Sequence, residues 1–158
     1  MSPERTMESE SHAIKCELAA EVLRSSGKLR LQVGGWSMLP TVFPGDTLLV
    51  ERYESREVAK GDIVLFSRDR RLFAHRALRS GSRSGVLTQG DAMPAPDPPV
   101  QGEEVLGKVI RISRNGKHIQ PRKWMRFRDR AVAACVQRSE VAARLIVSVH
   151  GLRQTSPV

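Results

Sequence analysis

The stretch DIVLFSRDRRLFAHRAL, residues 62–78, contains two short runs of strand-forming residues. The first run ends at Arg68 and the second begins at Arg71, with Asp69 and Arg70 between them. Short runs rich in β-branched and aromatic residues on either side of a two-residue connection are typical of a β-hairpin. We therefore expect this stretch to form two antiparallel strands.

Runs of the same kind occur on both sides of this hairpin. They are LRLQV (29–33), TLLVERY (47–53), VLTQ (86–89) and EVLGKVIRIS (104–113). The clearest turn signal is Asn115-Gly116, directly after the last run. Many short strands joined by tight turns indicate a small, mainly β domain with antiparallel pairing, which we assign to residues 28–120. At 158 residues the chain is long enough to bury a core without disulfides or metals.

A helix is expected before this domain. Ile14, Leu18 and Val22 recur at helical spacing with Leu23 beside them, and they predict the apolar face of the helix. Glu17 and Glu21 lie on its polar side, and Gly27 stands where a helix normally ends. Residues 1–27 are therefore assigned to an N-terminal polar segment and an amphipathic helix.

A second helical pattern follows the β domain, and we assign residues 121–158 to a basic C-terminal helix and tail. One face is predicted to be apolar, and its members are Trp124, Phe127, Ala131, Cys135, Ala142, Leu145 and Val149. Another face is basic and comprises Arg122, Arg126 and Arg130. Cys135 and Cys16 fall among apolar neighbours and match no metal-ligand spacing, so we expect reduced core thiols and no metal or other cofactor.

The net charge of +9 comes entirely from the C-terminal part of the chain. Residues 111–158 hold 11 Lys and Arg residues against 2 Asp and Glu residues, whereas the preceding residues are balanced. A neutral body with a basic tail favours an anionic partner, and a solvated face kept basic for solubility is the alternative. We expect peripheral association of residues 121–149 with an anionic membrane, and no specific nucleic acid, because aromatic side chains for base stacking are few.

The sequence predicts a cytoplasmic or peripheral membrane protein. No stretch supplies the run of about 20 apolar residues that crosses a bilayer. Residues 131–149 come closest, but Arg138, Glu140 and Arg144 interrupt them. The first residues are acidic and polar, so no secretory signal peptide is expected.

Ser37 stands in a turn of unusual composition. It lies within GGWSMLPTVFPGD (34–46), with two glycines before it and a proline after it. Such a turn can present a serine hydroxyl, and its backbone N–H groups can approach an oxyanion where no Cβ intervenes. His75 lies inside a predicted strand, and Asp91 and Asp97 follow in one loop. The chain therefore holds a potential nucleophile, base and orienting carboxylate.

The short motifs around these residues occur in a specific order. They are Ser37-Met38-Leu39-Pro40-Thr41, Gly45-Asp46, Gly61-Asp62-Ile63-Val64, His75-Arg76-Ala77, Gly90-Asp91, Asp97 and Gly107-Lys108-Val109. In this order, over about half the chain, they resemble the signal peptidase I-like serine peptidases. That superfamily also includes the self-cleaving LexA-type repressors.

The resemblance implies a small, partly closed antiparallel β domain with serine endopeptidase activity. It places Ser37 at the nucleophile position and His75 at the general base, which is lysine in most bacterial members and histidine in archaeal and endoplasmic-reticulum types. An aspartate of the region after Gly90 then supports the histidine. Asp97 is the favoured candidate and Asp91 the alternative, because a Gly-Asp pair also suits a structural role in the loop.

Other positions of the pattern have structural interpretations. Asp46 and Asp62 are expected to cap turns, and Met38 to pack beneath the nucleophile. Trp36 stands before Ser37, where a small residue is common, and predicts a bulkier cleft wall. The membrane anchor usual in signal peptidases is not found in this sequence.

The resemblance implies cleavage after small residues in a preprotein or small precursor peptide. Two alternatives stay open. A LexA-type self-cleaving regulator predicts a DNA-binding module ahead of the core, which the residues before Lys28 do not provide. A catalytically inactive relative would bind peptides or nucleic acid, but the presence of Ser37, His75 and Asp97 favours the peptidase.

Overall fold

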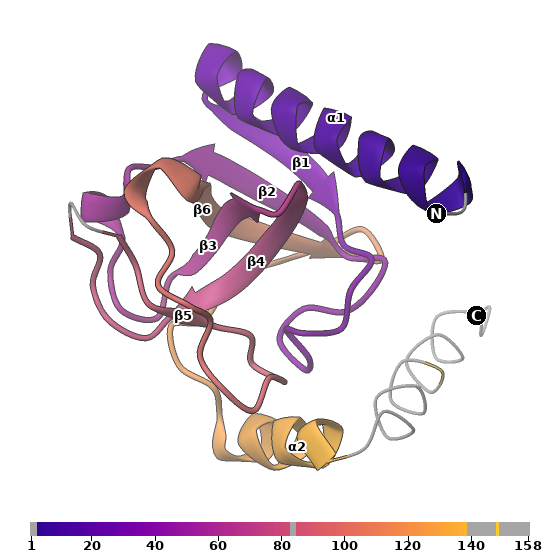
Figure 1. Ribbon diagram of the computed structural model, residues 1–158. Coiled ribbons are helices and arrows are strands. Elements are labelled where there is room, and N and C mark those ends of the chain that lie inside the picture. The colour runs from indigo at the N-terminus through magenta and orange to yellow at the C-terminus, as the bar shows by residue number, and fades with distance from the viewer. Residues whose placement is uncertain (1–2, 83–84, 139–147, 149–158) are drawn as a thin grey trace.

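The computed structural model describes residues 3–82, 85–138 and 148. The elements follow in the order α1 (Pro3–Ser26), β1 (Lys28–Gln32), β2 (Thr47–Arg52), β3 (Ile63–Arg68), β4 (Arg71–Ala77), β5 (Thr88–Gln89), β6 (Val105–Arg114), β7 (Lys117–Ile119) and α2 (Phe127–Arg138). Short 3-10 turns at Ser55–Glu57 and Gly102–Glu104 precede β3 and β6. The expected mainly β class, with one helix before the sheet and one after it, is confirmed (Figure 1).

The described strands form one open antiparallel sheet. Its order is β1-β2-β6-β3-β4-β5, and β7 pairs with β6. The predicted hairpin is confirmed, since β3 pairs with β4 along its whole length and the last pair is Arg68↔Arg71. The turn residues Asp69 and Arg70 have φ angles of 49° and 59°. Positive φ at both central positions is typical of the hairpin turn whose twist matches that of the strands.

Both faces of the sheet are buried at its centre, where β3 lies. Ile63 and Leu65 point into a cluster that includes Leu23 of α1, whereas Val64 and Phe66 point into a second cluster on the other face. Each of these four strand residues is at most 2% exposed. Burial on both faces explains why the sequence of β3 is continuously apolar rather than alternating.

The helix α1 covers one face of the sheet, but with a different side from the one predicted. Cys16, Ala19 and Leu23 are buried, whereas Ile14 and Leu18 are 63% and 61% exposed. The prediction that Ile14 and Leu18 form the buried face is therefore wrong. Small side chains at Cys16 and Ala19 allow close approach of the helix to the sheet, and Leu23 enters the core cluster. The packing surface, rather than the apolar spacing alone, decides which side of the helix is buried.

The helix α2 packs on two loops near one edge of the molecule. Val136 and, in part, Val132 join a buried cluster with Leu39, Phe43 and Ala92. Leu39 and Phe43 belong to the turn between β1 and β2, and Ala92 to the loop after β5. Figure 1 shows α2 lying below these loops. The helix thus supports the two segments that carry Ser37 and Gly90.

The apolar face predicted for the C-terminal helix is wrong in its described part. Trp124 is 60% exposed, and Ala131 and Cys135 are also exposed. Cys135 is therefore not a core thiol, whereas Cys16 is buried. Contact with the two loops selects the side of α2 that holds Val136. Of the remaining predicted members, Ala142, Leu145 and Val149 lie outside the described residues, and so does the side chain of Phe127.

A buried carboxylate fixes the turn between β1 and β2. Asp46, which is 3% exposed, accepts hydrogen bonds from the Phe43 N–H at 2.8 Å and from Arg114 Nε and Nη2 at 2.9 and 2.6 Å. Arg114 also donates to the Thr41 carbonyl at 3.1 Å. The turn-capping role predicted for Asp46 is confirmed, and the same contacts tie the end of β6 to the turn that carries Ser37.

Candidate active site

Ser37 is the first residue of a turn that is fixed by hydrogen bonds within the turn and from a second loop. Within the turn, the Val42 N–H donates to the Met38 carbonyl at 3.0 Å. From the loop after β5, the Ala92 N–H donates to the Ser37 carbonyl at 2.8 Å. Met38 is 4% exposed and belongs to the core cluster, as its predicted packing position requires. The main chain of Ser37 is therefore fixed while its side chain stays partly accessible.

The structure brings Ser37, His75 and Asp97 into one hydrogen-bonded line. His75 Nε2 lies 2.9 Å from Ser37 Oγ, and His75 Nδ1 lies 2.8 Å from Asp97 Oδ2. The Thr88 hydroxyl donates to the same Asp97 oxygen at 2.7 Å. With Nδ1 protonated towards the carboxylate, Nε2 is free to accept the serine proton, which is the tautomer that nucleophilic activation requires.

Two aromatic rings pack against the imidazole of His75. The centroids of the Phe66 and Phe73 rings each lie 5.8 Å from the imidazole centroid. His75 itself is 4% exposed and pairs with Val64 in the sheet. The strand backbone and the two rings thus hold the imidazole in one orientation between its two hydrogen-bond partners.

The pKa of Asp97 is lowered from the ordinary aspartate value of 3.8. Burial acts to raise it, but hydrogen bonds from His75 and Thr88 and the charges of His75 and Arg68 together outweigh burial. The carboxylate is therefore ionised at neutral pH, the state that holds the imidazole and stabilises its protonated form.

Arg68 anchors the loop that presents Asp97. Its guanidinium donates to the carbonyls of Pro98 and Pro99, both at 2.9 Å, and to the two carboxylate oxygens of Glu104, both at 2.7 Å. The Asp97 N–H also donates to the Thr88 carbonyl at 2.8 Å. The loop is proline-rich, and these contacts fix it at the end of β3.

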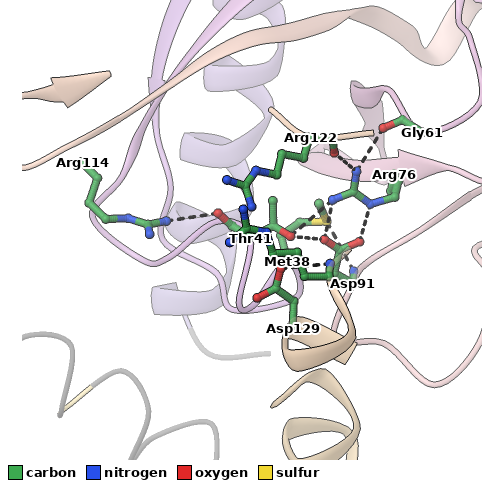
Figure 2. Close-up of polar contacts among 9 residues, drawn as sticks. Met38, Thr41, Gly61, Arg76, Asp91, Arg114, Arg122 and Asp129 are labelled. Atoms are coloured by element: carbon green, nitrogen blue, oxygen red, sulfur yellow. Dashed lines mark hydrogen bonds and ion pairs between the residues drawn. The ribbon is translucent and has the colours of Figure 1, made fainter. Parts of the chain in front are cut away.

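Asp91 lies in a separate polar cluster (Figure 2), and among the described residues its side-chain partners are Arg76 and Thr41 rather than His75. Both of its oxygens accept from the guanidinium of Arg76 at 2.7 Å, and the Thr41 hydroxyl donates to one of them. The side chains of Arg76 and Asp91 are 9% and 2% exposed. Arg76 also donates to the carbonyls of Gly61 and Arg122, at 3.0 and 2.5 Å. Of the two predicted aspartates, the structure therefore places Asp97 at the histidine and Asp91 in a buried ion pair.

Gly90 is a site residue that the glycine pattern around Ser37 did not reveal. A Cβ at Gly90 would lie 2.6 Å from the Ser37 carbonyl oxygen and 3.1 Å from His75 Nε2. By contrast, a Cβ at Gly34 or Gly35 would meet no atom within 4 Å. The glycine that the site requires is the one in the Gly-Asp motif after β5. Thr88 was also missed, although its place in a predicted strand next to that motif was the available signal.

The two lysines that lie in or beside the sequence motifs, Lys60 and Lys108, contact residues other than Ser37. Lys60 Nζ is 5.4 Å from the centroid of the Trp124 ring, and Lys108 forms an ion pair with Asp62 at 3.1 Å. Asp62 also accepts the Ala59 N–H at 3.0 Å, which confirms its turn-capping role. Among the described side chains, a histidine is thus the base hydrogen-bonded to the serine. The described segments contain no group of three or more His, Cys, Asp or Glu residues that could bind a metal.

A cleft of about 730 Å³ opens beside Ser37. Its walls include Leu31 and Val33 in and after β1, and Leu72 and Phe73 in β4, and α1 contributes a third side. A smaller hollow of about 480 Å³, lined by residues 52–56, 102, 103, 105 and 106, contains no member of the hydrogen-bonded line. The larger cleft is therefore the one placed to bind a molecule that reacts at Ser37.

A buried histidine hydrogen-bonded to a serine and a carboxylate, beside an open cleft, is the arrangement that serine hydrolases of several unrelated folds share. A family model described as Peptidase S24-like matches residues 2–110. Because the match spans more than half of the chain, the chain belongs to this family, and the resemblance to the signal peptidase and LexA-type superfamily is confirmed. A search of curated proteins finds no significant match. Within the described residues, no helix is long and apolar enough to cross a bilayer.

Gly90→Ala is expected to reduce peptide cleavage by about 10- to 100-fold, because a shift on the order of 1 Å in a reacting group can cost that much. The added methyl group would displace the Ser37 carbonyl or the His75 ring. The measurement is kcat/KM on a peptide cleaved by the wild type, with circular dichroism to confirm folding. Thr47→Ala in β2 is the control, since Thr47 lies outside the cleft lining and the hydrogen-bonded line. Equal activity of the two variants would contradict this account.

Asp97→Asn and Asp91→Asn are expected to fail in different ways. The first removes the carboxylate that fixes the His75 tautomer and is expected to lower kcat by up to about 10⁴-fold with the fold retained. The second leaves the buried Arg76 without an opposite charge and is expected to destabilise the protein by about 3–5 kcal/mol. Steady-state kinetics and urea unfolding on both variants separate the two effects. A loss of kcat in well-folded Asp91→Asn equal to that in Asp97→Asn would exclude the assignment.

The lowered pKa of Asp97 predicts a pH-dependent contribution to stability. Because its folded pKa lies below the unfolded one, the carboxylate stabilises the fold above the ordinary value of 3.8. That contribution is lost as the pH falls through the folded pKa. Urea unfolding of wild type and Asp97→Asn at neutral pH and near pH 3 is expected to show a stability difference that shrinks in acid. A difference that stays constant with pH would show that ionised Asp97 adds nothing to stability.

Proposed function

We propose that the chain is a serine endopeptidase in which Ser37 attacks the scissile carbonyl, His75 transfers the proton and Asp97 orients His75. The observation that carries this proposal is the continuous line of hydrogen bonds from Ser37 Oγ through both ring nitrogens of His75 to Asp97. Acyl transfer by serine requires a base within hydrogen-bond reach, because a neutral hydroxyl is a weak nucleophile until a base accepts its proton.

The proton path follows from the geometry. As Ser37 Oγ bonds to the carbonyl carbon, its proton moves to His75 Nε2, and the protonated imidazole faces the ionised Asp97. Collapse of the tetrahedral intermediate breaks the C–N bond and passes that proton to the leaving amine. A water molecule then gives a proton to Nε2 and attacks the carbonyl carbon of the acyl-serine. The bond between that carbon and Oγ breaks, the acyl part leaves as the carboxylic acid product, and the proton returns from Nε2 to Oγ.

Two backbone groups are candidates for stabilising the oxyanion. Among the described residues, the N–H groups of Ser37 and Met38 have no hydrogen-bond acceptor. Both groups belong to the turn that carries the nucleophile. Fixed N–H donors in such a turn stabilise negative charge as it develops, without any reorganisation during the reaction.

The proposed substrate is an extended peptide lying between β1 and β4. Among the described residues, β1 pairs only with β2, and only Arg76 and Ala77 of β4 pair with β5. The outer edge of β1 and the first part of the outer edge of β4 are therefore unpaired, and both strands line the cleft. A peptide added at such an edge gains main-chain hydrogen bonds. The resemblance to signal peptidases supports small residues before the scissile bond, in a preprotein or a small precursor peptide.

We also propose that the segment before α2 contacts an anionic membrane surface. Trp124 is 60% exposed, and Lys60 Nζ lies over its ring at 5.4 Å. Arg122, Lys123 and Arg126 are exposed beside it in the sequence. An exposed indole among cations suits the boundary between lipid headgroups and acyl chains, and supports peripheral association within residues 121–149.

Incubation with a library of small-residue peptides tests the proposed activity. Wild type is expected to cleave after small residues, and Ser37→Ala is expected to be inactive because it lacks the attacking oxygen. Mass spectrometry of the products, with and without anionic liposomes, identifies the cleaved bonds and any dependence on lipid. Thr47→Ala serves as a control, since it changes a hydroxyl of β2 outside the hydrogen-bonded line.

The same experiment separates the alternatives. Cleavage of the chain itself in wild type, with no peptide products, would favour a LexA-type self-cleaving regulator. Peptides bound intact by both proteins would favour an inactive binding module. Equal cleavage by wild type and Ser37→Ala would exclude the proposed nucleophile.

A further inference from the structure

The cleft beside Ser37 has basic side chains at one end and apolar side chains near Ser37. Its side formed by α1 and the start of β4 carries His12, Lys15 and Arg71. Its walls closer to Ser37 are apolar and include Met38 and Phe73. The sequence motifs did not include α1, so this basic end, defined by His12, Lys15 and Arg71, is not part of the catalytic pattern described above.

The charge of the basic end is not neutralised within the described structure. Neither Lys15 nor Arg71 forms an ion pair with another described residue, whereas Arg68, three positions earlier in the chain, is paired with Glu104. No aspartate or glutamate occurs among the described residues that line the cleft. Both cations are exposed and can reach a ligand that enters the cleft. An anionic group on that ligand is their natural partner.

Strand geometry gives the distance between the basic end and the hydrogen-bonded line of Ser37, His75 and Asp97. Arg71 and His75 lie in the same strand, four positions apart. At a rise of about 3.3 Å per residue, their backbones are roughly 13 Å apart. An extended peptide beside β4 has a similar rise, so the residue that faces Arg71 lies about four positions from the scissile bond.

We propose that Lys15 and Arg71, with His12 as an additional hydrogen-bonding group, select substrates that carry an acidic side chain about four residues from the scissile bond. This inference rests on the proposed peptidase function and adds the charge of the substrate to it. The apolar walls accept the residues near the cleaved bond, and the basic end accepts the carboxylate. The helix α1 thereby becomes a specificity element of the site.

The preference is graded rather than absolute. Ion pairs between exposed groups contribute modestly and are screened by salt. Two such pairs predict a discrimination of about three- to tenfold between an acidic and a basic peptide. The same screening predicts that the discrimination narrows as the ionic strength rises.

Matched peptides test the proposal. A peptide cleaved by wild type is prepared with Glu, Gln or Lys at each position about three to five residues from the scissile bond, on either side. Wild type is expected to show a kcat/KM about three- to tenfold higher for the best Glu peptide than for its Lys counterpart. The double variant Lys15→Glu/Arg71→Glu is expected to invert this order. Lys117→Glu, an exposed charge reversal in β7 outside the cleft lining, is expected to keep it.

A binding measurement makes the outcome independent of turnover. Ser37→Ala is titrated into fluorescein-labelled Ala/Ser peptides that contain a single Glu, Gln or Lys, and fluorescence anisotropy reports the affinity. Tighter binding of the Glu peptides, lost on adding Lys15→Glu/Arg71→Glu, supports the basic end even if no peptide is cleaved. Equal cleavage of Glu and Lys peptides by wild type, with Ser37→Ala inactive, overturns the charge preference and leaves the peptidase intact. Absence of charge-dependent binding likewise overturns it.

Discussion

The buried ion pair between Arg76 and Asp91 determines how the segments of the site meet. Arg76 directly follows His75 in β4, and Asp91 directly follows Gly90 in the loop after β5. Each member of the pair is thus adjacent in sequence to a residue that touches the reacting groups. The Thr41 hydroxyl extends the same cluster to the turn that carries Ser37. The pair therefore links the strand of the base, the loop of Gly90 and the turn of the nucleophile in one buried cluster.

The alternation of side chains along a strand allows one short segment to serve two purposes. His75 and Arg76 point to opposite faces of β4. The imidazole packs against the stacked pair of Phe66 and Phe73 rings, and the guanidinium donates to Asp91. Desolvation offsets most of the attraction within a buried ion pair, so such a pair adds little net stability compared with apolar packing. We infer that its value here is geometric, because it fixes two loops against one strand.

Features encoded over a few neighbouring residues could be predicted from the sequence. The hairpin at Asp69 and Arg70 and the turn-capping carboxylates of Asp46 and Asp62 depend on local hydrogen bonds and strand pairing. The end of α1 at Gly27 is equally local, since its φ of 73° is the left-handed conformation that glycine favours. These elements follow from backbone preferences that do not depend on the rest of the fold.

Features decided by contacts between distant segments could not be predicted in the same way. Ile14 and Leu18 have ideal helical spacing, yet the sheet accepts the smaller side chains of Cys16 and Ala19. The requirement for glycine at position 90 arises because the loop after β5 passes against the Ser37 carbonyl, a contact between residues 53 positions apart in sequence. Nothing in the composition of the Ser37 turn itself carries that information. The order of the motifs placed Ser37, His75 and the two aspartates in one site and favoured Asp97 over Asp91, but the contacts that distinguish the two aspartates come from the tertiary structure.

The division between sheet and helices suggests how chemistry and selectivity are separated in this fold. β3 is buried on both faces, so substitutions of its side chains would disturb the packing of the core. Each helix contacts the site at its margin. Val136 of α2 packs beneath the two loops, and Lys15 of α1 lines the cleft. A substitution on the cleft side of α1 can alter the charge that a substrate meets without moving His75. Substrate preference can therefore change at low cost to the geometry of the catalytic line, because the residues that set the two properties lie on different elements.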